Sequence, residues 1–381
     1  MGDITIRNVF LPFHDPAKAT ELYNVICQSG KVHAIVKSSE HDGEVWQEAQ
    51  QLDGGDKCFI LDKCDRLLTG DFPEALRVTA AAKAQFPHDL DDLYERGKRL
   101  IVESVESGVT CMRAHVEIDA TVKQSCLKIA LRLKKDLSHL CDIQIAVFAQ
   151  DPIASGETRD AGDHSLSNLG EMQAALVMDG IEAIGSAPYV ESNIDESRWN
   201  VQCIFDLAWD HKLHVDFHLD YNLDSSQTPL IWFVLGELQA RIAAGKWDDR
   251  MHVCIGHATR LTMFSSEEWT KFTNIVKSAH LPVTLVGLPQ SDLYMMGRSL
   301  EPIPRGTLNV VELERKYGVQ VAMAVNNVGN AFTPQGPPDP LALCPLGVAI
   351  FQAGTTAASQ ALVALNVVQT PLYQYPEIWL I

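Results

Sequence analysis

The sequence lacks long apolar runs and basic stretches, and each absence excludes a class of partner. No hydrophobic segment approaches the roughly 20 residues that a membrane-spanning helix needs, so no membrane partner is expected. The longest basic cluster is Arg132-Leu133-Lys134-Lys135, and 31 Lys and Arg residues stand against 49 Asp and Glu residues, a formal net charge of −18. Phosphate backbones reward clustered positive charge, so nucleic acid is not expected as a partner either.

Paired cysteines are also missing. The nine cysteines are scattered singly, their number is odd, and no Cys-x-x-Cys motif occurs. This usage is typical of reduced thiols in an intracellular protein rather than of a disulfide framework. The chain opens with strand-like alternation from Met1 to Arg7 and shows no targeting segment, so a cytoplasmic location is expected.

The most informative stretch is residues 213–221, in which polar and apolar residues alternate. Side chains at i and i+2 of a strand share a face, so His214, Asp216, His218 and Asp220 are expected on one side. An ordinary core has no use for such a face. The pattern favours a strand of a β/α barrel whose polar end opens into a site, and the alternative is a half-exposed antiparallel strand.

A strand-then-helix rhythm runs through most of the chain. The strand candidates are 109–117, 142–149, 181–187, 213–219, 251–258, 282–288 and 319–326. The helix candidates are 91–107, 122–140, 169–178, 196–210, 230–244, 267–279 and 310–317. Alternation of this kind implies parallel pairing, and it predicts an α/β fold, a TIM-like (β/α)8 barrel whose first strand lies near residues 52–61.

The length of 381 residues is large for one compact core, so a smaller attachment to the barrel is expected. Residues 1–52 carry strand signals at 4–9 and 31–36 and are predicted to form a small, incomplete N-terminal β-sandwich. Residues 53–366 are assigned to the barrel and residues 367–381 to a short C-terminal tail.

Polar residues gather where the expected strands end. These are His115, Glu117, Gln150, Asp151, His218, Asp220, His257, Gln290, Asp292, Asn326 and Asn327. Barrel enzymes build their active sites at the carboxyl ends of the strands, so these residues are candidates for a site. A single histidine at a strand end is more often structural, whereas two at consecutive strand ends favour a functional role.

Five segments resemble cytosine deaminase-like members of the amidohydrolase superfamily, in order and in approximate spacing. They are Arg113-Ala114-His115-Val116-Glu117, Val147-Phe148-Ala149-Gln150, Asp216-Phe217-His218-Leu219-Asp220, Gly256-His257-Ala258-Thr259, and residues 288–298 with Leu-Pro at their start and Gly-Arg at their end. The resemblance covers about residues 57–365. It implies a metal-dependent β/α barrel that deaminates cytosine-type and other heterocyclic amidines.

The resemblance also implies a set of site residues. In that family a His-x-His pair on the first strand, histidines on the fifth and sixth strands and an Asp on the eighth hold one divalent metal. A Glu after the fifth-strand histidine moves protons. By position, His218 and His257 match the two later histidine ligands, and Gln150 matches a residue that recognises the heterocycle.

Three elements of that set are absent from this chain. No histidine occurs between His41 and His88, which removes the first-strand pair, and Tyr221 and Asn326 stand where the Glu and the eighth-strand Asp are expected. A neutral amide is neither a base nor a good ligand for a hard or borderline ion. Two histidines leave a catalytic metal one protein ligand short, unless another residue supplies a third. The candidates for that third ligand are Cys58 and Asp220.

Three hypotheses for function follow. The first is a repurposed barrel that acts without a metal cofactor on a small heterocyclic or carbonyl compound, with His218–Asp220 or His257–Tyr221 as acid and base. Its predicted catalytic residues are His218, Asp220, Tyr221, His257 and Asn326, and its predicted substrate-binding residues are His115, Gln150, Asp216 and Asp292. The second is a conventional amidohydrolase that holds zinc or iron at His218 and His257. The third is a non-catalytic descendant or a truncated product. A small-molecule ligand is the expected partner, and self-association into a homo-oligomer stays open.

Overall fold

The computed structural model describes residues 4–10, 22–28, 31–40, 50–53, 67–154, 167–248, 250–298, 301–302, 304–367 and 379–380. The chain divides into two compact units, residues 1–61 and residues 62–381. No helix in these ranges is both long enough and apolar enough to cross a lipid bilayer.

The N-terminal unit contains one four-stranded sheet. Its strands are β1 (Ile4–Phe10), β2 (Leu22–Gln28), β3 (Lys31–Lys37) and β4 (Gln50–Asp53), in the order β3-β2-β1-β4. The pairs β1–β2 and β2–β3 are antiparallel, and β1–β4 is parallel. The two strands expected in this region are therefore present, with two more beside them. The described part of this unit holds no second layer of the kind that a sandwich requires.

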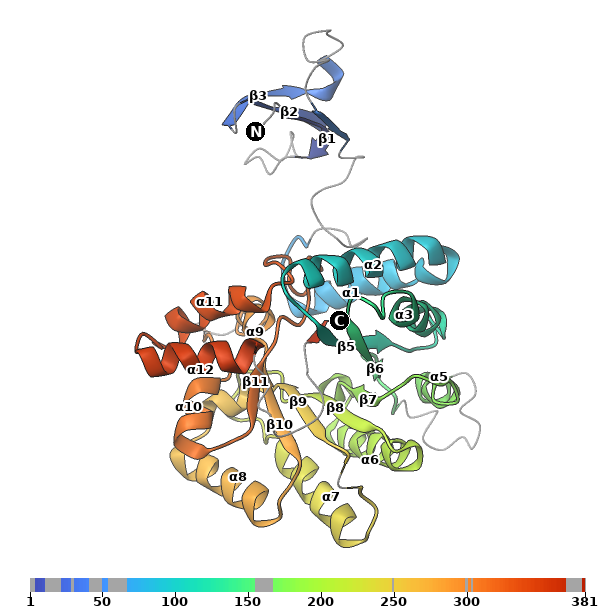
Figure 1. Ribbon diagram of the computed structural model, residues 1–381. Helices are drawn as coiled ribbons and strands as arrows, with labels where there is room; N and C mark the ends of the chain where they lie inside the picture. The colour runs from blue at the N-terminus through green and yellow to red at the C-terminus, as the bar shows by residue number, and fades with distance from the viewer. Residues whose placement is uncertain are drawn as a thin grey trace. The chain divides into compact units, whose positions relative to one another are not determined.

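The second unit is built on a curled parallel sheet. Its strands are β5 (Cys111–Glu117), β6 (Asp142–Ala149), β7 (Ala183–Ser186), β8 (His214–Leu219), β9 (Val253–His257), β10 (Val283–Gly287) and β11 (Val321–Met323). Each strand pairs in parallel with the next along the chain. All seven expected strands are confirmed, and Figure 1 shows the curl of the sheet that a TIM-like barrel has.

The place beside β5 differs from expectation. The expected first barrel strand near residues 52–61 does not form at residues 52 and 53, which belong to β4, and residues 54–61 lie outside the described part of the chain. The strand that pairs in parallel with β5 is β12 (Trp379–Leu380). The described strands of the second unit thus run in one series from β11 to β12.

Helices lie around the outside of the curled sheet (Figure 1). They are α1 (Phe72–Lys83), α2 (Leu90–Glu106), α3 (Ser125–Asp136), α5 (Asn168–Ala175), α6 (Ile194–His211), α7 (Ile231–Ala243), α8 (Ser266–Ser278), α9 (Pro289–Met295), α10 (Val310–Glu312), α11 (Leu343–Ile350) and α12 (Thr356–Val367). Local signals set several starts. Ser265 and Glu268 form a reciprocal capping box at α8, and the Asp71 side chain accepts from the backbone of Glu74 at α1.

The alternation along β8 separates two faces. Val215, Phe217 and Leu219 are fully buried, and Phe217 meets Phe205 of α6 with ring centroids 5.5 Å apart. Full burial of each such apolar side chain contributes about 1.5–3 kcal/mol. The apolar face therefore packs on the helices, and His214, Asp216 and His218 are left to face the inside of the curled sheet.

Candidate functional site

Three histidines from three strands meet at the carboxyl ends of the sheet. The ring centroid of His218 on β8 lies 5.4 Å from that of His115 on β5 and 4.8 Å from that of His257 on β9. Gly256 makes room for this arrangement, because a Cβ at that position would lie 3.0 Å from Cδ2 of His218. All three imidazoles are buried. Their convergence agrees with the site expected at the strand ends.

Asp216 joins this cluster from the layer below His218. Its Oδ2 accepts a hydrogen bond from Nη1 of Arg113 at 2.9 Å and lies 3.2 Å from Nε2 of His115. Burial raises the pKa of Asp216 to about 6, against the lowering effect of the Arg113 guanidinium. Arg113 is fixed in turn, since its Nε donates to Oε1 of Gln144 at 2.5 Å. Sequence analysis missed this role, although Arg113 precedes His115 by two residues on the same face.

His115, Asp216 and His218 form a compact group of possible ligands, here called the HDH group. One imidazole nitrogen from each histidine and one carboxylate oxygen all lie within 4.8 Å of one another. Burial, with His257 and His115 close by, lowers the pKa of His218 well below its ordinary value. The imidazole is therefore held in the neutral form, in which it can accept a proton or bind a metal ion.

His257 and Asp292 form a buried dyad. Nδ1 of His257 lies 2.8 Å from Oδ1 of Asp292, and Oδ2 of Asp292 accepts from Oγ1 of Thr307 at 2.7 Å. Burial lowers the pKa of His257 to about 3 and raises the pKa of Asp292 well above its ordinary value. The carboxyl group fixes the orientation of the ring and leaves Nε2 as the nitrogen available to a ligand.

The expected acid–base partners take other contacts. Both carboxylate oxygens of Asp220 accept hydrogen bonds from the start of α7, from the backbone nitrogens of Leu230 at 2.7 Å and Ile231 at 3.0 Å. Asp220 therefore caps a helix, where a pair with His218 was expected, and both of its carboxylate oxygens take part in that cap. Cys58, the other candidate for that ligand, lies outside the described residues.

Tyr221 contacts His257 through its ring. The two rings stack with centroids 3.8 Å apart, and the Tyr221 hydroxyl donates to the backbone oxygen of Ser291 at 3.3 Å. Burial raises the pKa of Tyr221 well above its ordinary value, so the phenol stays protonated. The hydrogen-bond partner of His257 is thus Asp292, where Tyr221 was expected.

Asn326 lies in a chain of neutral hydrogen-bonding groups. Its Nδ2 donates to Oγ of Ser291 at 2.7 Å, and that hydroxyl is 2.6 Å from Oγ1 of Thr333. The amide is buried at the position where the resemblance implies an Asp ligand. The Nδ2 bond fixes the side chain after β11, and the buried Oδ1 has no hydrogen-bond partner among the described residues.

Three site residues share an uncommon backbone conformation. Asp220, His257 and Asn326 have φ values of 51°, 63° and 67°, each at or just beyond a strand end. Asp, His and Asn tolerate this left-handed region better than other non-glycine residues, although it costs about 1–3 kcal/mol each. Strain of this kind concentrates at functional sites, which supports a working site at these strand ends.

Gln150, expected to bind substrate, lies beside an aromatic cluster. Its Nε2 is 3.5 Å from the hydroxyl of Tyr189, whose pKa burial raises to about 12. The ring of Phe72 on α1 has centroid distances of 6.1 Å to Tyr189, 5.9 Å to Tyr221 and 5.6 Å to Phe332. Edge-on contacts of this geometry tie α1 to the loops that follow the strands.

A second polar cluster, which the sequence did not reveal, surrounds Lys83. Its Nζ lies 2.5 Å from Glu117, 2.8 Å from Asp119 and 2.8 Å from Asp151. Burial alone would lower the pKa of Lys83, but the three carboxylates outweigh it and raise that pKa. Glu117 and Asp151 were among the polar residues expected at the strand ends, but Lys83 was not expected beside them, because α1 was not among the predicted helices.

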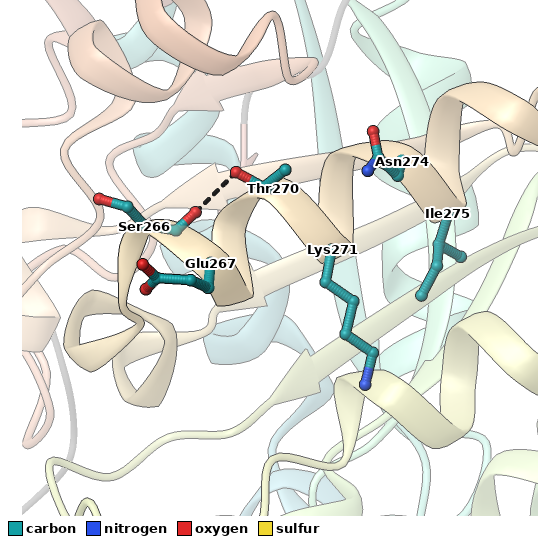
Figure 2. A pocket seen from close by; sticks show the side chains of 6 residues that line it. All are labelled: Ser266, Glu267, Thr270, Lys271, Asn274 and Ile275. Carbon is teal, nitrogen blue, oxygen red and sulfur yellow. Dashed lines mark hydrogen bonds between the residues drawn. The ribbon is translucent and has the colours of Figure 1, made fainter.

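The surface also has a shallow hollow away from the strand ends. Figure 2 shows that its lining comes from one helix, α8. The lining residues are Ser266, Glu267, Thr270, Lys271, Asn274 and Ile275. The hydroxyl of Thr270 donates to the backbone oxygen of Ser266 within this helix at 2.7 Å. The hollow contains none of the converging histidines and carboxylates, so it is not the candidate site.

Comparisons with known proteins place the fold. No family model matches the chain. The structure of 5-methylcytosine deaminase from Klebsiella pneumoniae aligns with 95% of this chain and 84% of its own, with 20% identity and a TM-score of 0.68. N-isopropylammelide isopropylaminohydrolase from Burkholderia multivorans aligns with 96% of this chain and 85% of its own, with 20% identity and a TM-score of 0.59.

A sequence relative gives a shorter match. N-isopropylammelide isopropyl amidohydrolase of Pseudomonas sp. (strain ADP) is 27% identical over 130 residues, which are 33% of this chain and 30% of that protein. The two structures share their fold with almost the whole of this chain, and the sequence match spans a third of it.

Proposed function

Because this chain has the fold of cytosine deaminase-like amidohydrolases, as its motifs indicated, we propose that it hydrolyses an exocyclic C–N bond of a small planar heterocycle. The names of the similar proteins describe a deaminase and two enzymes that act on N-isopropylammelide. The observation that carries the proposal is the buried His257–Asp292 dyad beside His218 at the carboxyl ends of neighbouring strands. Barrel active sites are built there.

His257 has the geometry of a proton carrier. In the tautomer whose Nδ1–H donates to Asp292, Nε2 carries no hydrogen, and it takes a proton from the attacking water as the water oxygen bonds to the ring carbon. The C–N bond to the exocyclic amine then breaks, and the same proton passes to the departing nitrogen. The products are the ring carbonyl compound and ammonia or an amine, with no other reactant consumed.

Substrate recognition is assigned to groups that surround this dyad. The Gln150 amide offers both a donor and an acceptor to the edge of a heterocycle. Tyr189 offers an apolar ring to a planar ligand beside Tyr221, whose own ring is stacked on His257, and both phenols stay protonated at neutral pH. A planar ring with an exocyclic nitrogen suits this combination.

The metal ligand set implied by the resemblance does not fit these residues. His218 and His257 are present, but Asn326 offers only a neutral amide oxygen, which is a poor ligand for a borderline ion, and both carboxylate oxygens of Asp220 cap α7. Two imidazoles do not reach the three protein ligands of a catalytic zinc site. No step of the proposed reaction therefore passes through a metal held by that set.

The test is release of ammonia or amine from a panel of amino-substituted pyrimidines and triazines by the purified chain. The His257→Asn variant is expected to lose at least about 100-fold in kcat/KM, the usual contribution of a general acid–base group. His214→Asn is the matched control, since His214 lies at the start of the neighbouring strand β8, away from the carboxyl ends of the strands, and its Nδ1 accepts from the backbone of His252. Equal rates in both variants, or no hydrolysis across the panel, would contradict the proposal.

A further inference from the structure

The HDH group has the donor set of a divalent metal site. It combines two buried imidazoles and one buried carboxylate from β5 and β8, and its ligand atoms lie within 4.8 Å of one another. Imidazole and carboxylate together suit Zn²⁺, and three protein ligands are the number that catalytic zinc sites use.

The separations agree with shared ligation of one ion. Two ligands of a tetrahedral zinc with bonds of about 2.0–2.1 Å are roughly 3.3 Å apart. Nε2 of His115 lies 3.2 Å from Oδ2 of Asp216, which also accepts from Arg113, so Oδ1 of the same carboxylate is the oxygen left for an ion. The widest separation in the group is within 4.8 Å. The two histidine rings already approach each other, with centroids 5.4 Å apart.

Asp216 supplies an independent observation. This residue is fully buried, and its Oδ1 has no hydrogen-bond partner among the described residues, although Oδ2 is held by Arg113. A buried carboxylate oxygen without a partner costs about 1–3 kcal/mol or more, so it calls for an explanation such as an ion. Arg113 neutralises the carboxylate but occupies only one of its two oxygens.

From these observations we infer that the HDH group binds one divalent transition-metal ion, at a place different from the ligand set implied by the resemblance. The two sets share only His218. In the inferred site His115 and Asp216 replace the missing first-strand pair, and His257 remains free of the metal as the partner of Asp292. An ion here would also lower the pKa of a bound water.

The experiment measures metal content and needs no activity. The full chain is stripped with a chelator, equilibrated with Zn²⁺, dialysed and analysed by elemental mass spectrometry, with the variants His115→Asn, His218→Asn, His257→Asn and His214→Asn treated in parallel. Substituting a residue that merely orients a ligand lowers metal affinity 10–100-fold, so loss of a ligand is expected to cost more than about 100-fold. Wild type, H257N and H214N are expected to retain near-stoichiometric zinc, and H115N and H218N to lose it.

Each other result overturns the inference. Wild type that retains no zinc leaves the group as an internal hydrogen-bond network around Arg113. Loss of zinc in H257N with retention in H115N places the ion on the family positions instead. Retention of zinc in all four histidine variants overturns it too, and loss in an additional Asp119→Asn variant would then place the ion in the carboxylates around Lys83.

A second measurement uses the wild-type chain, so that it does not depend on whether the variants fold. Co²⁺ added to the stripped wild-type chain is expected to give the visible absorption of a four-coordinate nitrogen–oxygen site, and a flat spectrum counts against the site. The inference stands apart from the proposed reaction. Bound metal without hydrolysis contradicts the reaction alone, and hydrolysis by the stripped chain without metal uptake contradicts the site alone.

Discussion

The HDH group and the cluster around Lys83 both place carboxylates in the interior, and they differ in how the negative charge is balanced. Around Lys83 a single ammonium contacts all three carboxylates at 2.5–2.8 Å, so the protein supplies the cation itself. In the HDH group the internal cation, Arg113, reaches only one oxygen of Asp216. Carboxylates are fully paired when one cation of the chain contacts each of them, as at Lys83, and a buried carboxylate oxygen is left for an external ion when the cation contacts only the other oxygen, as at Asp216.

The largest expected effect on stability comes from removing the Asp216 carboxylate of the HDH group. Asp216→Ala removes the carboxylate that accepts from the buried Arg113 guanidinium, and breaking a buried ion pair in this way typically costs about 3–5 kcal/mol in the free energy of unfolding. Urea denaturation with chelator present measures this cost without a contribution from metal. The double variant Arg113→Met/Asp216→Leu is expected to regain much of the loss, since well-packed apolar residues often replace a buried ion pair. An Asp216→Ala variant as stable as wild type would mean that the Arg113–Asp216 pair does not contribute to the free energy of unfolding.

Removing the Lys83 ammonium tests whether the three carboxylates around it then take up an external cation. Lys83→Met leaves three carboxylates facing one another and is expected to destabilise by about 2–3 kcal/mol, less than above because Asp151 is 39% exposed. Mn²⁺ should raise the Tm of this variant more than that of wild type, in which Lys83 already contacts the three carboxylates and only the HDH group is open to the ion. Lys134→Met, which breaks the partly exposed pair with Glu182, is the control and should cost at most about 1 kcal/mol. An equal rise in Tm with Mn²⁺ in the variant and in wild type would contradict the stated difference between the Lys83 cluster and the HDH group.

A smaller effect is expected when the His218 imidazole of the HDH group is displaced. Gly256→Ala places a Cβ 3.0 Å from Cδ2 of His218, so the imidazole must shift by a few tenths of an ångström. The expected cost is about 1 kcal/mol, with weaker zinc retention. Gly236→Ala in α7 is the control, because its Cβ would meet nothing within 4 Å and alanine favours a helix by about 1 kcal/mol. Unchanged zinc retention in G256A would show that the position of His218 is not critical.

A third buried carboxylate, with neutral donors only, gives the smallest effect. Glu191 accepts from the backbone nitrogen of Ile153 at 2.9 Å and from Nδ2 of Asn200 at 2.7 Å. Burial raises its pKa despite these bonds. Its folded state therefore holds the proton longer than its unfolded state, and stability falls as pH rises from the ordinary value of 4.5 through the raised pKa. The Tm of wild type should fall relative to Glu191→Gln across this window, and parallel Tm curves would contradict the shift.

Local pattern predicted the part of the site that lies within strands. Alternation placed His214, Asp216 and His218 on one face, and the bounds of β6 are those expected from the sequence. The same alternation failed at Asp220, since the strand ends at Leu219 and the backbone turns into the left-handed region. A period-two pattern carries no information about where the strand stops.

The alternation of polar and apolar residues could not predict contacts between side chains that are distant in the sequence. Asp292 meets His257 only because α9 follows β10 back over the neighbouring strand end, and Lys83 meets Glu117 across 34 residues of chain. Neither pairing has a fixed spacing that a sequence displays. The resemblance supplied His218 and His257 but assigned no partner to either of them.

Arg113 has a consequence for the order in which the chain folds. Its guanidinium bonds to Asp216 and Cys254, which lie 103 and 141 residues further along the chain. These contacts close long loops, whose entropy must be lost before the contacts form. The interior charge pair is therefore expected to form late, after the local strand–helix units, and the Asp216 variants should mainly accelerate unfolding while leaving the refolding rate nearly unchanged.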